Sequence, residues 1–66
     1  MYIQKGKVYK SKYFGGQVVY ALENCFSDDA LVYVYSFNKL ENIFFVANQL
    51  EEVQEELAEE YLQELA

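Results

Sequence analysis

The sequence contains no histidine, no arginine and no proline, and it has a single cysteine, Cys25. One cysteine excludes an intramolecular disulfide. The absence of histidine removes the usual zinc-ligand sets and the commonest general base of enzymes. We therefore expect a protein that is not an enzyme and that uses no metal and no cofactor. Cys25 follows an apolar run, so we expect a buried structural thiol at this position.

Long hydrophobic runs are also missing. The longest apolar stretches, residues 30–35 and 43–47, are far shorter than the roughly 20 residues that a membrane-spanning helix needs. The first residues show no apolar segment behind a basic start, which a secretory signal would have. Together with the lone cysteine, these absences predict a soluble, cytoplasmic protein that does not bind membranes.

The chain is short, and its length predicts one domain over residues 1–66, with a β part over about residues 2–46 and a helix over about residues 49–65. A domain of this size buries only about 60% of the surface that its unfolded chain exposes. Without disulfides or metals, stability must come from an apolar core or from a partner. The composition favours an apolar core, since 53% of the residues are hydrophobic and 18% are aromatic. Self-association is the other route.

Two runs rich in Val and Tyr flank Gly15–Gly16, which predicts a hairpin with a two-residue turn. The first run covers residues 7–14, and the second covers residues 17–22 with an extension to Phe26. Because side chains alternate between the two faces of a strand, one parity of the second run is expected to face the core: Val18, Tyr20, Leu22 and Phe26.

The strongest strand pattern covers residues 30–37, and it is apolar on both faces. One face carries Leu31, Tyr33, Tyr35 and Phe37, and the other carries Val32 and Val34. Such a strand is either covered on both sides or part of an interface. Short polar turns precede and follow it, and a fourth, short strand is expected over residues 43–46.

The C-terminal part of the chain predicts an amphipathic helix. Asn48 is the expected N-cap, and Glu51, three residues later, completes a capping-box arrangement. Apolar residues recur at spacings of three and four: Leu50, Val53, Leu57, Tyr61 and Leu65. The predicted fold is therefore α+β, either a four-stranded antiparallel sheet or a small SH3-like barrel, followed by one C-terminal acidic helix.

Charge is distributed unevenly along the chain, whose net charge is −6. The expected helix contains no lysine and seven glutamates: Glu51, Glu52, Glu55, Glu56, Glu59, Glu60 and Glu64. Like charges four residues apart destabilise a helix by about 0.2–0.5 kcal/mol per pair. Over the roughly 20 Å of this helix, the charge spacing is about 3 Å, which is close to that of phosphates along one DNA strand. The glutamates therefore serve either solubility or electrostatic docking.

The N-terminal part is basic and holds Lys5, Lys7, Lys10 and Lys12 among Tyr2, Tyr9, Tyr13 and Phe14. Lysines mixed with aromatic residues are typical of proteins that bind single-stranded nucleic acid. The overall acidity and the absence of arginine argue against that function. Another interpretation is that these lysines pair with the glutamates, within one chain or between two copies.

These patterns favour a non-catalytic protein-binding module. In its concrete form, the glutamate-rich helix is a nucleic-acid mimic that masks a basic surface of a partner protein, as in small acidic inhibitors or decoys of phages and mobile elements. A second contact surface is expected from Lys7, Lys10, Lys12, Tyr33 and Tyr35. The alternatives are a homo-oligomeric structural protein that assembles through the aromatic sheet or the helix stripe, and a binder of single-stranded nucleic acid.

Overall fold

The computed structural model describes residues 2–13 and 15–65, and it is an antiparallel sheet with one C-terminal helix, an α+β protein as predicted. The sheet has five strands in the order β4-β3-β2-β1-β5, and all neighbours are antiparallel. The strands are β1 (Val8–Ser11), β2 (Val18–Ala21), β3 (Leu31–Ser36), β4 (Glu41–Val46) and β5 (Leu50–Glu52). A 3-10 turn, η1 (Ala47–Gln49), precedes β5, and the helix is α1 (Glu55–Leu65).

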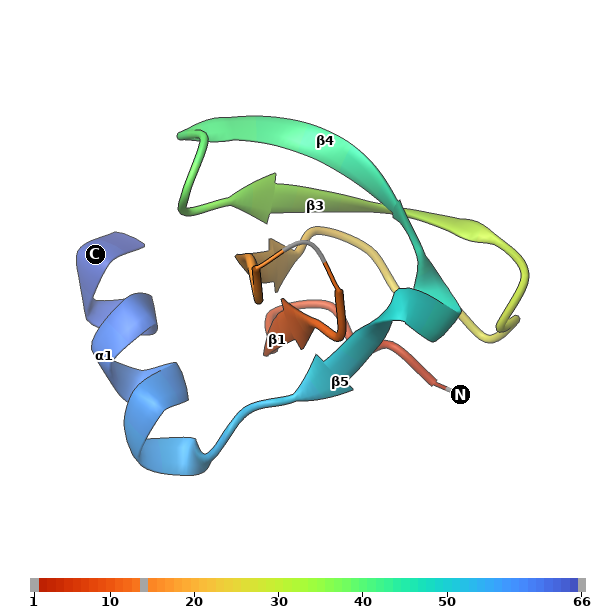
Figure 1. The fold of residues 1–66 in the computed structure, drawn as a ribbon. Helices are drawn as coiled ribbons and strands as arrows, with labels where there is room; N and C mark the ends of the chain where they lie inside the picture. Colours follow the sequence, from red (N-terminus) through yellow and green to blue (C-terminus); the bar gives the residue numbers. More distant parts are fainter. Residues whose placement is uncertain (1, 14, 66) are drawn as a thin grey trace.

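Two features of the predicted sheet are wrong: it has five strands, not four, and it is open, not a closed barrel. The first and last strands of the order, β4 and β5, do not pair with each other, so each is an edge of the sheet. Figure 1 shows the sheet strongly curved, with β4 arching over the strands below it. Curvature without closure gives the sheet an inner and an outer face.

The inner face carries the hydrophobic core. Tyr9 is fully buried there, and its hydroxyl accepts a hydrogen bond from the Gln4 backbone N–H at 2.9 Å. Cys25 is buried, as predicted, and its backbone pairs with Ile3. The other fully buried core residues are Ile3, Val19, Ala21, Val32, Val34, Ala47 and Leu50.

The prediction of which face of β2 points to the core was wrong. Val19 and Ala21 are fully buried, whereas Phe26 is 77% exposed. The register explains this, because Ala21 pairs with Val34 of β3 and directly opposed residues share a face. Both faces of these strands are apolar, so alternation did not distinguish them. The curved inner face takes mainly small side chains, and most of the larger aromatic ones lie on the outer face.

The β1–β2 connection is longer than predicted, because β1 ends at Ser11 and β2 begins at Val18. The Ser11 hydroxyl donates to the Tyr13 carbonyl at 2.5 Å and accepts from the Tyr13 N–H at 3.1 Å, so the chain turns before the glycines. Gly15 has φ +76° and Gly16 has φ +71°, values that glycine adopts without strain. The predicted strand residue Phe14 lies outside the described residues.

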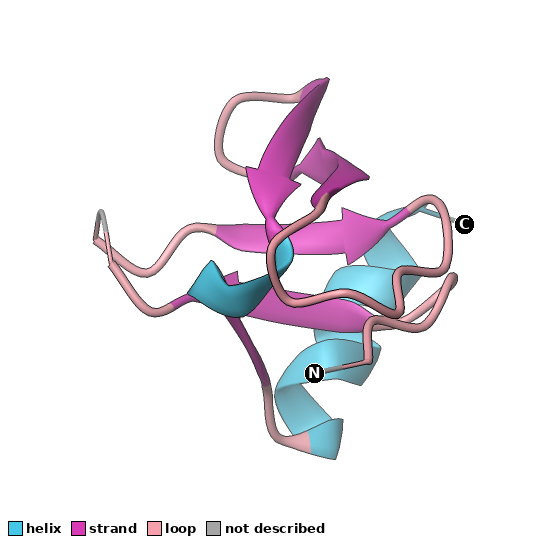
Figure 2. Ribbon diagram, turned by 90° about the vertical axis from the view of Figure 1, so that its right-hand side faces the viewer, coloured by secondary structure: helices cyan, strands magenta, loops and turns pink. Residues whose placement is uncertain are grey.

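The helix begins six residues later than predicted, at Glu55. Asn48 is not its N-cap but part of η1. Leu50 is fully buried and pairs with Ser11, which makes residues 50–52 an edge strand. Burial and strand pairing of this segment outweigh its local helix propensity. The helix then lies against the outer face of the sheet (Figures 1 and 2).

Candidate functional site: the acidic helix and the aromatic sheet face

The helix α1 separates its acidic and apolar side chains into two halves. At about 100° per residue, one half of its circumference carries Glu55, Glu56, Glu59, Glu60 and Glu64, all of which are exposed. The other half carries Leu57, Ala58, Tyr61, Leu62 and Leu65. We call the five exposed glutamates of α1 the acidic face.

The apolar half of α1 holds the helix on the sheet. The Tyr61 ring lies 4.8 Å from the Phe37 ring between centroids, and Tyr61 and Ala58 are half-buried. The helix also contacts β1, and on the outer face of the sheet Val8 and Val18 are buried. Leu57, Leu62 and Leu65 of the same half remain 38%, 36% and 43% exposed, so the sheet covers only part of this half, and the acidic face points to solvent.

The first two predicted site glutamates belong to a different surface. Glu51 and Glu52 lie on β5, where they face Lys10 and Lys7. The Lys10 Nζ–Glu51 Oε1 distance is 3.5 Å, and the Lys7 Nζ–Glu52 Oε1 distance is 2.5 Å. The hydrogen bond to Glu52 raises the pKa of the Lys7 ammonium above its ordinary value. These carboxylates are neutralised within the chain, as the lysine–glutamate interpretation predicted, but on a strand and not on the helix.

The five glutamates of the acidic face differ from Glu51 and Glu52 in their surroundings. In the described part of the chain, none of them lies within ion-pair distance of a lysine. Glu55 to Glu64 spans nine residues, about 14 Å at 1.5 Å per residue. The spacing is therefore still one charge per roughly 3 Å, as the longer helix predicted.

The predicted lysine–tyrosine surface is not assembled as a stacking platform. Tyr9 is fully buried and cannot stack on a base. Lys7 and Lys10 are engaged in ion pairs with β5. Lys12 lies in the β1–β2 turn, where its backbone N–H donates to the Gln49 carbonyl at 2.8 Å. The arrangement therefore favours cross-strand neutralisation over phosphate binding.

The predicted contact residues Tyr33 and Tyr35 lie on the outer face of β3, half-buried. Tyr33 is opposite Phe44 of β4, with ring centroids 4.9 Å apart. Tyr35 makes an edge contact with Phe37 at 5.3 Å. We call Tyr33, Tyr35, Phe37 and Phe44 together the aromatic face.

Sequence reasoning missed Phe44, which is 61% exposed. The pair Phe44–Phe45 was the available signal, because neighbouring residues of a strand point to opposite faces and one of the two must leave the core. Phe45 is the buried member of the pair, at 9% exposure.

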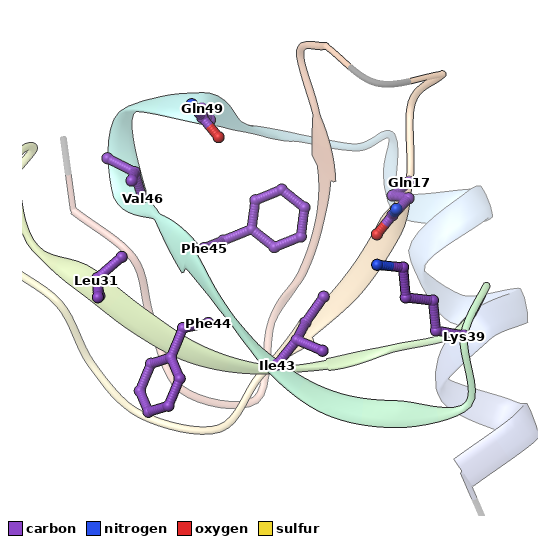
Figure 3. Close-up of a pocket in the computed structure, with 8 residues that line it drawn as sticks. All are labelled: Gln17, Leu31, Lys39, Ile43, Phe44, Phe45, Val46 and Gln49. Atoms are coloured by element: carbon purple, nitrogen blue, oxygen red, sulfur yellow. The ribbon is translucent and has the colours of Figure 1, made fainter.

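A shallow hollow of about 380 Å³ lies along β4. Figure 3 shows the Phe45 ring turned into it and the Phe44 ring turned away. Its polar groups come from the side chains of Gln17, Lys39 and Gln49, and the Gln17 Oε1 atom is buried with no hydrogen-bond partner. The remaining lining residues are apolar: Leu31, Ile43, Phe44, Phe45 and Val46. None of its described lining residues carries a carboxylate, thiol or hydroxyl group.

Two further classes of site are absent from residues 2–13 and 15–65. No group of three or more Cys, Asp or Glu side chains there could hold a metal ion. The same residues form no helix with the length and apolar character needed to cross a membrane. A further exposed aromatic pair, Tyr2 and Phe26, stacks with ring centroids 4.7 Å apart.

Known proteins do not extend this description. No protein-family model, no curated protein and no solved structure matches the chain at a significant level. Functional inference therefore depends on the geometry and charge of the two faces.

Proposed function

We propose that this chain is a non-catalytic protein-binding module that docks through the acidic face of α1 onto a basic surface of another protein. The observation that carries the proposal is the segregation of five exposed carboxylates, none in an ion pair within the described structure, on one half of a helix whose other half contacts Phe37 through Tyr61. A formed helix presents these charges at a regular spacing. Pre-organisation of this kind lowers the entropy lost on binding.

The spacing of the row favours a nucleic-acid-binding protein as the partner. One charge per roughly 3 Å is close to the phosphate spacing of about 3.4 Å along one DNA strand. A groove that holds a phosphate backbone with Lys and Arg side chains would accept the acidic face by the same contacts. The protein would then act as an inhibitor or decoy, a mimic of the nucleic acid.

The acidic face also lowers the stability of the free helix. Glu55–Glu59, Glu56–Glu60 and Glu60–Glu64 are like-charge pairs four residues apart, and each costs about 0.2–0.5 kcal/mol. Glu60 and Glu64 lie in the second half of the helix, toward its negative end. Features that violate local stability rules tend to lie at functional sites, which supports a binding role for this face.

We further propose that the protein is soluble and acts in the cytoplasm. Its single cysteine is buried and unpaired, as is usual for proteins of a reducing compartment. We propose that a second contact uses the exposed part of the aromatic face, next to Tyr33 and Tyr35. The predicted lysines contribute less to it, because Lys7 and Lys10 are in ion pairs with β5.

The proposal is tested by affinity capture with two matched variants. The first, Glu59→Gln/Glu60→Gln, removes two charges from the acidic face. The second, Glu41→Gln/Asp29→Asn, removes two exposed charges elsewhere, so both variants have the same net charge. Each protein is immobilised, exposed to lysate of the native host, and washed at low and at high salt.

We expect wild type and the second variant to capture the same basic protein, and high salt or added DNA to release it. The first variant should capture several-fold less, because both lost charges lie in the docking row. Equal capture by the two variants would show that only the net charge matters. Binding that resists high salt would contradict electrostatic docking.

A further inference from the structure

The free edge of β4 is the least protected part of the sheet. β4 is the uppermost strand in Figure 1, and in the described structure it pairs on one side only, with β3. Exposed edge strands are usually short or carry Lys, Pro or a bulge that prevents pairing with another chain. β4 has six residues and neither Lys nor Pro. Its outer row of backbone N–H and C=O groups is open to a further strand.

The hydrogen-bond pattern shows which residues turn these groups outward. The Ala47 N–H donates to the Ala30 carbonyl at 3.0 Å, so the 30–47 pair is hydrogen-bonded. The Leu22 N–H donates to the Tyr33 carbonyl at 3.0 Å, so Tyr33 bonds toward β2. Because antiparallel ladders alternate, every second residue of β4 bonds to β3. The outward-facing residues are then Asn42, Phe44 and Val46.

We propose that a second copy of this chain pairs with β4 in antiparallel fashion, about a two-fold axis at Phe44. In this register Phe44 opposes Phe44 of the second copy, and Asn42 opposes Val46 of the second copy. Each of the three outward residues then donates one backbone hydrogen bond and accepts one across the junction. The two sheets join into one continuous sheet.

The side chains fit the same register. Opposed residues share a face, so the two Phe44 rings meet on the outer face, each beside its own Tyr33 at 4.9 Å. On the inner face Ile43 meets Phe45 of the second copy. The charged residue of the strand, Glu41, falls opposite Ala47 of the second copy and not opposite another carboxylate.

The neighbouring register is poorer. If the axis passed through Ile43, Phe44 would oppose Asn42 and Glu41 would oppose Phe45. The aromatic contact would be lost, and a carboxylate would face an aromatic ring. Asn42 and Phe44 would still oppose each other, but Val46 would oppose Leu40, which lies outside β4. A two-fold axis at Phe44 is therefore favoured by side-chain chemistry, and it pairs all three outward residues of β4.

The acidity of the chain does not oppose this assembly. α1 contacts β1 and, through Tyr61, Phe37 directly after β3, so it does not lie on the free edge of β4. Across the junction the two β1 strands are seven strand spacings apart and the two β3 strands three, about 34 Å and about 14 Å along the sheet at about 4.8 Å each. The Debye length at physiological salt is about 8 Å, so the two acidic faces are screened from each other. Both remain exposed in the dimer.

The first test is the molar mass in solution, measured by light scattering or sedimentation over a concentration series. Two strands of six residues form an interface at the small end of the specific range, so we expect a dimer of twice 7.8 kDa in the micromolar range. A mass that stays at 7.8 kDa up to about 100 µM would overturn the proposal.

Two lysine variants separate edge pairing from face-to-face stacking. Phe44 and Leu31 lie on the same outer face at 61% and 60% exposure, but Leu31 is on β3 and away from the edge. Phe44→Lys places two ammonium groups at the axis and should raise the dissociation constant at least about tenfold. Leu31→Lys should leave it unchanged. Dissociation of both variants would show an interface between outer faces and would overturn the edge register.

A cysteine pair checks the axis directly. Opposed Cα atoms of an antiparallel pair are about 5.5 Å or less apart, within the range that a disulfide spans. Phe44→Cys should therefore give a covalent dimer on mild oxidation, and Leu31→Cys should not. Both variants retain the buried Cys25, so the difference reports the engineered position. Equal cross-linking of the two would contradict an axis at Phe44.

Discussion

Lys7 and Glu52 join the two ends of the β part of the chain: the Lys7 ammonium lies 2.5 Å from the Glu52 carboxylate, although 45 residues separate them. Lys7 directly precedes β1, and Glu52 ends β5. The same strand pair carries the Lys10–Glu51 ion pair. The basic start and part of the acidic end of the sequence therefore neutralise each other across two adjacent strands.

This pair predicts an alkaline limit of stability. Its hydrogen bond to Glu52 raises the pKa of Lys7 above the ordinary value of 10.5. A raised pKa in the folded state stabilises the protein fully below the unfolded pKa, and the contribution is lost as pH rises through the folded pKa. We expect wild type to be more stable than Lys7→Met at about pH 7–9, and the difference to vanish above the raised pKa. Thermal unfolding measured from about pH 7 to about pH 12, past the raised pKa of Lys7, measures this difference.

The control for this experiment is Lys39→Met, since Lys39 has no ion pair within the described structure. The difference in melting temperature between Lys39→Met and wild type should not change over the same pH range. A Lys7→Met difference that is equally independent of pH would show that the Lys7–Glu52 contact adds nothing in solution.

The contact between Tyr61 and Phe37 predicts that α1 can be released without unfolding the sheet. No residue of α1 is fully buried, and Tyr61 contacts the ring of Phe37, directly after β3. Tyr61→Ala should lower the free energy of unfolding by about 1–2 kcal/mol, less than for a fully buried aromatic residue. Hydrogen exchange should accelerate in α1 and remain slow in β1–β3. Gln63→Ala, on the exposed half of the helix, should change neither.

The charges of α1 predict opposite effects at its two ends. Glu60 repels both Glu56 and Glu64, so Glu60→Gln should stabilise the protein by about 0.4–1 kcal/mol. Glu55 lies in the first turn, where a carboxylate interacts favourably with the helix dipole. Glu55→Gln should therefore give no gain. Urea unfolding at low salt measures both, and equal gains would contradict the dipole argument.

Leu40 predicts a simple stabilising substitution in the β3–β4 turn. It has φ +56°, a left-handed conformation that costs a non-glycine residue about 1–2 kcal/mol, and its side chain is 75% exposed. Asn tolerates this conformation better, so Leu40→Asn should raise the melting temperature. A lower melting temperature would show that the Leu40 side chain contributes packing that outweighs the strain.

The acidic helix shows how far sequence reasoning reached. The sequence predicted a C-terminal helix that ends near Leu65 and carries glutamates on one half, and both features are confirmed for Glu55–Leu65. Its start was placed six residues too early because residues 49–54 are compatible with a helix in isolation. Only the neighbouring strand β1, about forty residues earlier in the sequence, makes Leu50 a buried strand residue.

The aromatic face shows the same limit. Residues 30–37 were predicted as a two-sided apolar strand, and the structure confirms a strand over Leu31–Ser36 with both sides apolar. Alternation cannot tell which side is inner when both are apolar. The sheet buries Val32 and Val34 and leaves Phe44 of the next strand largely exposed.

Local patterns were enough to establish the α+β class, the positions of four strands, the buried Cys25 and the acidic half of the helix, because each depends on residues close together in the sequence. The open five-stranded sheet, the neutralised Glu51 and Glu52, the inner face and the free edge of β4 came from the three-dimensional arrangement. These features depend on the pairing of distant segments and on the curvature of the sheet, which decide what is buried and which charges meet.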